Sequence, residues 1–397
     1  MRSPTLSLAP DRSTGTLSTR YAPVTEVRAG LKRNVMACIH FGRKPVMGDD
    51  PREIPLTLES LSGAAAGVIE KDLRSPALAL GAAAGDVEKE LSSPALAPGA
   101  APVVELWTSD RPVDFGWDAG FGFATNGEFL FGHLYLLEVE LNAMVAASFK
   151  AYARLTAFLE DRGYPRLLRC WNFVNDINHG EHDGERYKQF SLGRYKALSD
   201  RADFERHLPA ATAIGMHEPG LLIYFLAAKE GGVQVENPRQ VPAFHYPRQY
   251  GPRGPSFSRA TFARFGNVDH LLVSGTASVV GHATHHPNDT AAQLDETLTN
   301  LQALLQHAAA THLNGGVWEP ETLRLYLRDP AELAMVRARV DQALGREAPL
   351  LILEGDICRQ DLRVEIEGLY RAAPSARAGG PKSFSMTPAA TPARPAP

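Results

Sequence analysis

The spacing of apolar residues along this chain switches repeatedly between a strand-like and a helix-like pattern. In the first half, apolar runs that start at Val103 and Phe129 predict strands, and a helical stretch over 142–162 ends before Gly163. Helices often end at such a glycine. Further segments complete the half: a strand at 166–174, a polar helical stretch at 185–198, and strands at 211–216 and 220–229.

The second half repeats this order of elements. Two short strands are expected within 270–281, and the turn at Pro287, Asn288 and Asp289 predicts the start of a helix. A strand at 322–328, a helix at 330–344 and strands at 348–356 and 362–370 follow. The pattern predicts an α+β fold in which a mixed sheet with helices on one face is used twice. A cleft between two such modules is a natural substrate site.

Three segments do not fit this pattern. Residues 1–20 and 374–397 are rich in Pro, Ala and Ser and lack periodicity, so we expect both to be disordered. Within 56–102, GAAAGVIEK at Gly63 returns as GAAAGDVEK at Gly81, which predicts an inserted surface loop, since so few Ala- and Gly-rich copies cannot bury a core. The expected domains are therefore 21–234, carrying this insertion, and 235–373.

Composition narrows the class of partner. The 397 residues hold 41 basic and 45 acidic side chains, a balance that creates no field for nucleic acid or an anionic membrane. A small-molecule substrate is the better expectation, with the chain as a monomer or small homo-oligomer. We find no apolar run of the roughly 20 residues that span a bilayer and no signal-peptide pattern, so the cytoplasm is expected.

The general catalytic motifs are mostly missing. The sequence contains no GxGxxG in a strand-to-helix context, no GxxxxGK[ST] and no GxSxG, which disfavours nucleotide cofactors and a serine nucleophile. Three cysteines without a CxxC pair indicate packing rather than a disulfide framework or zinc knuckle.

Histidines gather at two places in the sequence. HATHH places His282, His285 and His286 together, and HGEHDGE places His179 near His182, with acidic neighbours Glu181 and Asp183. Zinc or iron ligation is one reading of such clusters. Turn residues are the preferred interpretation, because the spacing is irregular and neither cluster matches HExxH. We therefore expect no metal and no cofactor.

Five stretches resemble the chorismatase family, which includes 3-hydroxybenzoate synthases and chorismate hydrolases; they are 167–194, 211–215, 235–260, 274–301 and 355–368. The last two also resemble the YjgF/RidA-like family, whose closing strand carries a functional glutamate that matches Glu365. The resemblance implies duplicated YjgF-like modules and release of pyruvate from chorismate. It implies 3-hydroxybenzoate as the product, with 4-hydroxybenzoate as a possible second one. The insertion at 56–102 departs from the family pattern.

Chorismate chemistry requires an acid and cationic or hydroxyl anchors. Glu365 alternates with apolar Val364 and Ile366, and burial raises the pKa of a carboxyl. Glu367 points to the same face of the strand and would raise that pKa further. The alternative is that one or both acids face solvent. The resemblance makes Glu365 the catalytic acid, and Cys358 stands where a cysteine in the family accompanies the aromatic product.

The candidate substrate-binding residues come from four segments. Arg186 and Arg194 lie eight positions apart on one predicted helix. Tyr246, Arg248 and Tyr250 belong to a basic, aromatic loop that could bind an anion. The alternatives for this loop are a solvated connection and a nucleic-acid surface. The tight turn at Ser274, Gly275 and Thr276 offers backbone amides and hydroxyls to a carboxylate. The full set is Arg186, Tyr187, Arg194, Ala213, Tyr246, Arg248, Tyr250, Ser274, Gly275, Thr276 and Arg359.

Other functions stay open at this point. A chorismate hydrolase would add water and release a 3,4-dihydroxycyclohexa-1,5-diene carboxylate. A YjgF-like imine deaminase needs an arginine that aligns near Leu350, and the leucine there argues against it. A non-catalytic binder of small carboxylates would hold its ligand without releasing pyruvate.

Overall fold

A computed structural model describes residues 16–27, 30–42, 49–62, 103–136, 143–201, 203–313 and 316–373. The alanine-rich repeat from Gly63 onwards and the tail from Pro374 lie outside these residues. So do residues 1–15 of the amino-terminal segment. Within the described part, no helix is long and apolar enough to cross a membrane.

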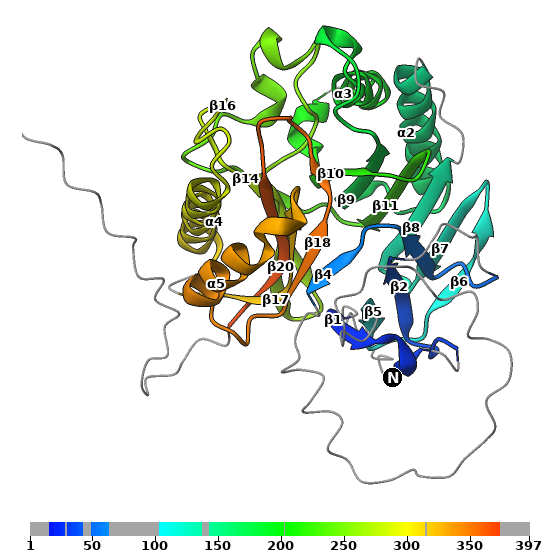
Figure 1. Ribbon diagram of the computed structural model, residues 1–397. Coiled ribbons are helices and arrows are strands. Elements are labelled where there is room, and N and C mark those ends of the chain that lie inside the picture. The colour runs from blue at the N-terminus through cyan, green and yellow to red at the C-terminus, as the bar shows by residue number, and fades with distance from the viewer. Residues whose placement is uncertain are drawn as a thin grey trace, which may run out of the picture.

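Two modules with the same topology form most of the molecule (Figure 1). The first consists of β7 (Phe121–Thr125), β8 (Phe129–Leu136), α2 (Met144–Asp161), β9 (Arg166–Asn175), α3 (Arg186–Leu198), β10 (Ala210–Met216) and β11 (Leu221–Ala228). The second consists of β13 (Ala260–Phe265), β14 (Val268–Ala277), α4 (Thr290–His312), β17 (Trp318–Leu327), α5 (Leu333–Leu344), β18 (Leu350–Glu354) and β20 (Val364–Ala372).

The strand order shows that the module is duplicated. It is β7-β8-β11-β9-β10 in the first sheet and β13-β14-β20-β17-β18 in the second. In each sheet the last strand of the module inserts between the second and third strands and is antiparallel to both, while the third and fourth strands are parallel. The predicted α+β class and the repeated order of elements are therefore confirmed.

Short strands extend both sheets. The first also contains β6 (Asp114–Asp118) and β19 (Asp356–Ile357), and the second contains β12 (Val233–Val235) and β4 (Ser60–Ser62). A separate sheet has the order β1 (Leu17–Pro23), β5 (Val103–Ser109), β2 (Val35–Phe41) and β3 (Glu53–Leu56). The remaining elements are a small hairpin of β15 (Val279–Val280) and β16 (Ala283–Thr284), and 3₁₀ turns at 24–26, 182–184, 204–207, 243–245, 248–250 and 330–332.

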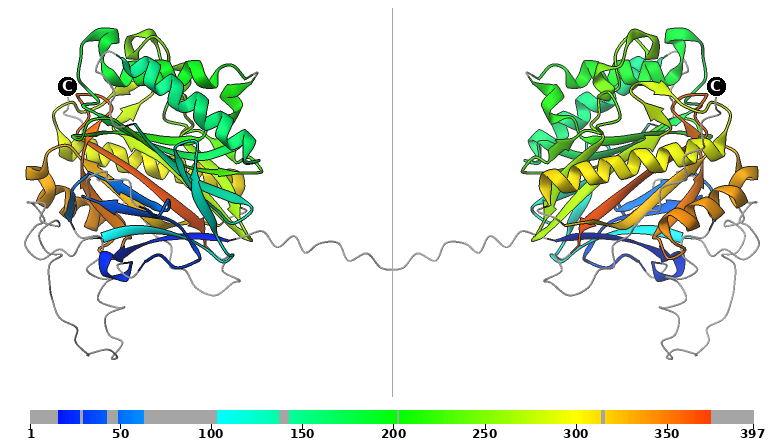
Figure 2. Two further views of the ribbon diagram at one scale, coloured as in Figure 1. Left: turned by 90° about the vertical axis from the view of Figure 1, so that its right-hand side faces the viewer. Right: turned by 90° about the vertical axis from the view of Figure 1, so that its left-hand side faces the viewer.

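Alternating side chains divide each strand between two cores. On β11, Leu222, Tyr224 and Leu226 face a central core shared by all three sheets, whereas Ile223 and Phe225 pack beneath α2. On β17, Leu325 packs beneath α4 and Tyr326 faces the central core. The helices thus cover the outer faces of the sheets, as the two views of Figure 2 show.

Three expectations about organisation need correction. Residues 17–20, assigned above to a disordered segment, begin β1, because this strand pairs with β5 from Leu17 opposite Ser109. The strand at Val103 is β5 of the separate sheet and does not belong to the first module. The proposed domain boundary after residue 234 falls inside β12, which pairs with β13 of the second module.

A buried ionic network joins the three sheets. Arg324 on β17 pairs with Glu105 on β5 at 2.8 Å and with Glu367 on β20 at 3.3 Å. Arg169 on β9 pairs with Glu367 at 2.5 Å, and each of these four side chains is at least 97% buried. Buried charges are tolerated only when they are paired in this way.

We predict that Arg324→Leu lowers the free energy of unfolding by about 3–5 kcal/mol, because it leaves Glu105 buried without its cation. The matched control is Arg371→Leu, which removes a surface pair with Glu319 on the neighbouring strand. That change should cost no more than about 1 kcal/mol. Urea unfolding measures both, and equal losses would contradict the assigned role of the network.

Candidate active site

A cavity of about 350 Å³ lies where the two modules meet. It is lined by residues from α3, from the loop between β12 and β13, from β14, and from the segment that leads into β20. The lining residues are Glu185, Tyr187, Lys188, Gln240, Tyr246, Gln249, Tyr250, Pro255, Phe257, Arg259, Gly275, Ala277, Val279, Cys358, Arg359, Gln360, Asp361, Leu362 and Glu365. This volume suits a small-molecule ligand.

Glu365 is the one buried acid among the acidic residues that line this cavity. It sits on β20 opposite Ala277 of β14 and is 4% exposed. The β14–β20 register shifts at Ser274 and Gly275, so a bulge faces the acid. A Cβ atom at Gly275 would lie only 1.8 Å from the Glu365 Oε1 atom. Glycine at this position is therefore what allows the carboxyl group to lie against the strand.

Glu367, two positions further along β20, is held by five side chains. Its Oε1 atom accepts hydrogen bonds from Tyr326 at 2.8 Å, from Trp171 at 3.1 Å and from Arg324 at 3.3 Å. Its Oε2 atom accepts hydrogen bonds from Arg169 at 2.5 Å and from the Thr212 hydroxyl. The network therefore fixes a negative charge behind Glu365.

Burial and this charge together control the titration of Glu365. Desolvation, followed by the repulsion from Glu367, raises the pKa of Glu365 from its ordinary 4.5 to about 8. Arg169 and Arg259 act in the opposite direction but do not cancel the effect. Glu365 is therefore a protonated acid at neutral pH, the state that a general acid requires.

Two arginines and a tyrosine form the cationic wall. Tyr246 contacts both arginines, since the guanidinium carbons of Arg259 and Arg359 lie 5.5 and 5.3 Å from its ring centre. Arg359 also lies 4.0 Å over the ring of Tyr250 and donates hydrogen bonds to the hairpin at His282 O and Thr284 Oγ1, both at 3.1 Å. Arg259 donates to the Tyr246 hydroxyl at 2.6 Å. Planar guanidinium groups of this kind match carboxylates.

A side pocket of about 40 Å³ adjoins the cavity at Glu365. Its lining includes Arg194 of α3 and Ala213 of β10, and it shares Tyr187, Gly275 and Cys358 with the main cavity. Arg194 is buried, and within the described residues its Nε and Nη2 atoms have no hydrogen-bond partner. A buried guanidinium in this state is costly unless an anion pairs with it.

Cys358 reaches the cavity because the chain leaves one sheet for the other. After β18, the short strand β19 pairs with β10 of the first module, opposite Ile214 and Gly215, before the chain returns as β20. Burial, followed by the charge of Glu365, raises the pKa of the Cys358 thiol to about 12, although Arg359 acts in the opposite direction. The side chain therefore remains a neutral thiol at physiological pH.

Arg328 holds this crossing segment in place. Its guanidinium donates to the carbonyl oxygens of Leu362 at 2.8 Å and of Ile357 and Arg359 at 3.0 Å. It also pairs with Asp356. With the Asn178 side-chain oxygen, at 3.0 Å, five backbone and side-chain acceptors surround this cation and fix the positions of Cys358 and Arg359.

Four of the sequence-based binding candidates lie away from the cavity lining. Arg248 is 67% exposed and pairs with Asp183. Ser274 and Thr276 are buried, and their hydroxyls bond to the backbone oxygens of Ser258 and Ser274. Arg186 is buried beside Asp176, and desolvation lowers its pKa. The side chains of Arg248, Ser274 and Thr276 are therefore engaged outside the cavity lining. The three guanidinium nitrogens of Arg186 have no hydrogen-bond partner among the described residues, so Arg186 stays a binding candidate.

The structure adds Arg259 and Gln240, which were not among the candidates. Both lie in the stretch 235–260 that carries the family resemblance, but polar residues are too frequent there for spacing to single them out. Among the described residues, one group of three side chains has metal-ligand geometry, namely His285, His286 and Glu296, and it is not part of the cavity lining.

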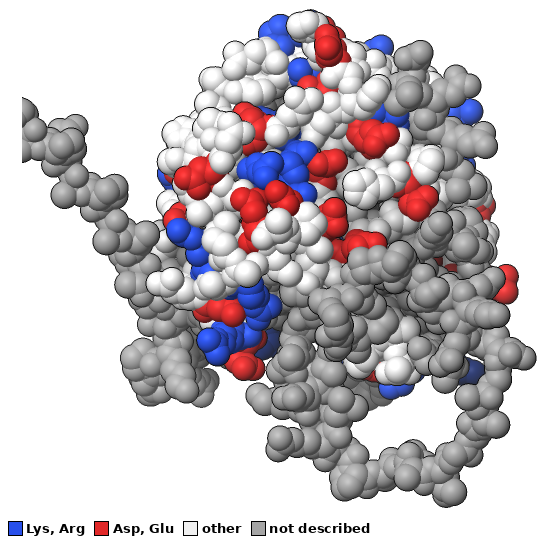
Figure 3. Space-filling model, in the orientation of Figure 1, with Lys and Arg blue, Asp and Glu red and all other residues white. Residues whose placement is uncertain are grey.

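The exposed charges are mixed in sign. On the face shown in Figure 3, Lys and Arg alternate with Asp and Glu rather than forming a patch of one sign. The basic, aromatic loop between β12 and β13 directs Tyr246, Tyr250 and Arg259 into the cavity. This use of the loop favours a small anion over nucleic acid as its partner.

A protonated, buried carboxyl group in an arginine-lined cavity is an arrangement that suits acid catalysis on a small anionic molecule. Comparison with known proteins gives the family. The amino-terminal chorismatase model of the FkbO/Hyg5-like kind matches residues 105–227. A 3-hydroxybenzoate synthase of Streptomyces hygroscopicus is 37% identical over 281 residues, which are 68% of this chain and 81% of that protein.

Two further comparisons, one with a sequence and one with a crystal structure, indicate the same family. A chorismatase of Streptomyces rapamycinicus is 38% identical over 274 residues, 67% of this chain and 81% of the relative. A chorismatase crystal structure superposes with a TM-score of 0.73 at 28% identity and covers 90% of this chain and 99% of its own. The chain belongs to the chorismatase family.

We predict that Glu365 makes stability depend on pH. Its pKa is higher in the folded chain than in the unfolded one, so its contribution is fully present below about pH 4.5 and is lost as the pH rises through about 8. Glu365→Gln should flatten this decline in urea unfolding measured across that window. Glu319→Gln, at an exposed ion pair, is the control. An unchanged slope in Glu365→Gln would show that the acid titrates normally.

Proposed function

We propose that this protein is a chorismatase that converts chorismate into 3-hydroxybenzoate and pyruvate. The observation that carries the proposal is the Glu365 carboxyl group, buried in an arginine-lined cavity with its pKa raised to about 8. The family relationship supports the same activity, since relatives covering most of the chain are named 3-hydroxybenzoate synthase and chorismatase.

The cavity suits a dianion. Chorismate carries two carboxylates, and the walls offer Arg259 and Arg359, both of which contact Tyr246. Arg194 offers a third cation in the side pocket, with two nitrogens free of partners in the described chain. We propose that one carboxylate lies against the Tyr246 wall and that the other reaches Arg194, which places the enol ether beside Glu365.

In the proposed first step, Glu365 gives its proton to the methylene carbon of the enolpyruvyl group. The ether carbon becomes an oxocarbenium centre, which the Glu365 carboxylate and the surrounding dipoles stabilise. The ring hydroxyl oxygen then bonds to the neighbouring ring carbon and returns its proton to the Glu365 carboxylate, while the bond from that carbon to the ether oxygen breaks and pyruvate leaves. The arene-oxide-like product then rearomatises to 3-hydroxybenzoate. Atoms balance without water, and no redox partner or metal enters the proposed steps.

The competing outcome is attack by water, which would give the dihydroxycyclohexadiene carboxylate. The neutral thiol of Cys358 and the ring of Phe257 line both the cavity and the side pocket next to Glu365. We propose that they restrict the room for a nucleophilic water and so favour the intramolecular path. A second product, 4-hydroxybenzoate, is compatible with the same acid.

A small-molecule substrate is thus the partner that we propose. None of the three cysteines, all of which lie in the described part of the chain, forms a disulfide bond. This agrees with a reducing compartment, and the cytoplasm remains our prediction. An imine deaminase and a non-catalytic carboxylate binder stay as alternatives, and they differ from a chorismatase by releasing no pyruvate from chorismate.

We predict that Glu365→Gln binds chorismate but loses turnover by at least ~10²-fold, the usual contribution of a general acid. Pyruvate is followed with a coupled assay, and products are separated by chromatography. In the unaltered protein the rate should fall as the pH rises through about 8, because the acid then loses its proton. Glu319→Gln is the matched control. Pyruvate release that survives in Glu365→Gln would rule out Glu365 as the acid.

We predict that Cys358→Ala shifts product from 3-hydroxybenzoate towards the hydrolysis product, since the smaller side chain admits water beside Glu365. The control is Cys170→Ala, because Cys170 is buried on β9 and does not line the cavity. The measurement is the ratio of 3-hydroxybenzoate to the hydrolysis product, obtained by chromatography. If both variants keep the ratio of the unaltered protein, Cys358 has only a packing role.

A further inference from the structure

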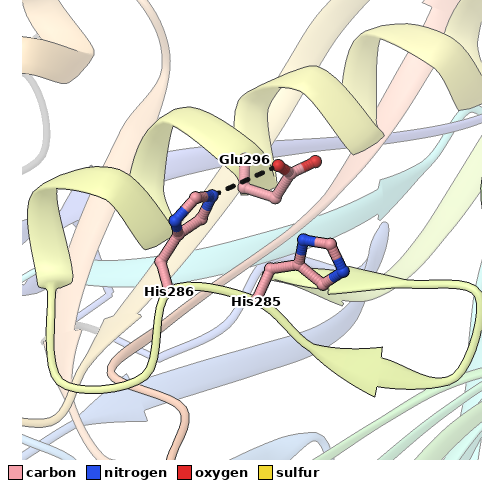
Figure 4. A group of neighbouring side chains, drawn as sticks. All are labelled: His285, His286 and Glu296. Atoms are coloured by element: carbon pink, nitrogen blue, oxygen red, sulfur yellow. Dashed lines mark ion pairs between the residues drawn. The ribbon is translucent and has the colours of Figure 1, made fainter.

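Two histidines and a glutamate converge outside the cavity. His285 and His286 follow the β15–β16 hairpin, and Glu296 extends from α4 towards them, as Figure 4 shows. Their ligand atoms all lie within 4.8 Å of one another. The sequence places the two histidines together but gives no sign that Glu296, ten positions later and on a helix, joins them.

The backbone of both histidines is held by hydrogen bonds. His285 exchanges two bonds with Ser278, one from its amide to the Ser278 carbonyl and one from the Ser278 hydroxyl to its own carbonyl, each 2.9 Å long. The carbonyl of His286 accepts from the Gln293 side chain at 3.1 Å. His286 has a φ of 55°. Such a left-handed conformation is uncommon outside glycine and suggests that the ring orientation serves a purpose.

The spacing of the ligand atoms suits a tetrahedral ion. The Nε2 atom of His286 lies 3.6 Å from the Oε2 atom of Glu296. Two ligands that each lie about 2.0–2.1 Å from a tetrahedral zinc ion are about 3.4 Å apart. His285 is exposed and can close the remaining distance by rotation of its side chain.

Arg239 orients the carboxylate. Its Nη2 atom pairs with the Oε1 atom of Glu296 at 2.6 Å, while Oε2 faces His286. Outer partners of this kind fix the direction of a metal-binding carboxylate. The guanidinium charge also opposes a nearby cation, so the site should bind more weakly than a closed site with four protein ligands.

We propose that His285, His286 and Glu296 bind one divalent ion of the zinc type, with water completing the coordination. Two imidazole nitrogens beside one carboxylate favour zinc over magnesium or calcium, which prefer ligand sets made of oxygen alone. The ion would tie the hairpin to α4, and the same hairpin holds Arg359 through His282 and Thr284. The site is independent of the proposed reaction, in which no metal takes part.

The test is calorimetric titration of the full chain, without a histidine tag, with Zn²⁺ in a non-chelating buffer. We expect one ion per chain and a loss of affinity of more than ~10-fold in each of His285→Ala, His286→Ala and Glu296→Gln. Zinc should also raise the midpoint of thermal unfolding of the unaltered chain but not of these variants.

The matched control is His282→Ala. His282 belongs to the same HATHH segment but contacts Tyr250, so its removal should leave zinc affinity unchanged. A zinc titration without saturable binding would overturn the proposal. So would an affinity that all three ligand variants retain, or one that is lost equally in His282→Ala.

Discussion

The Glu367 carboxylate contributes both to the packing of the two modules against each other and to the protonation of Glu365. It accepts hydrogen bonds from Arg169, Trp171 and Thr212 of the first module and from Arg324 and Tyr326 of the second. An anion buried this deeply is stable only because cations and hydroxyl groups from both modules reach it. The same anion, fixed on β20 two residues from Glu365, disfavours a second negative charge there. The same carboxylate therefore joins the sheets and adds to the effect of burial, which is the larger cause of the raised pKa of Glu365.

The surroundings of Glu365 follow from two departures from regular strand pairing. A bulge at Ser274 and Gly275 gives the carboxyl group its space on β14. The excursion of the chain to β19 carries Cys358 and Arg359 across to the first module, where β10 pairs with it and Arg328 fixes the return. Such irregularities are common beside active sites because they redirect side chains that a regular sheet would bury.

Much of this architecture can be predicted from the sequence. Helical spacing predicted α2 and α4, and the glycine after residue 162 marked the end of α2 to within a residue or two. The alternation of Val364, Glu365, Ile366 and Glu367 predicted a strand with both acids on one face, and the structure places both towards the central core. Local patterns of this kind are reliable because each apolar face must be buried against something.

What the sequence by itself determined is most of the helices and strands of the two modules, their repeated order and the acid on the closing strand, since these depend on residues close together in the chain. Only the tertiary structure decided which charges meet. Leu17 begins a strand because its partner is Ser109, Arg259 enters the cavity although Arg248 faces solvent, and Glu296 joins two histidines across a turn. Each depends on segments distant in sequence, whose contacts arise when the whole chain packs and which no local spacing encodes.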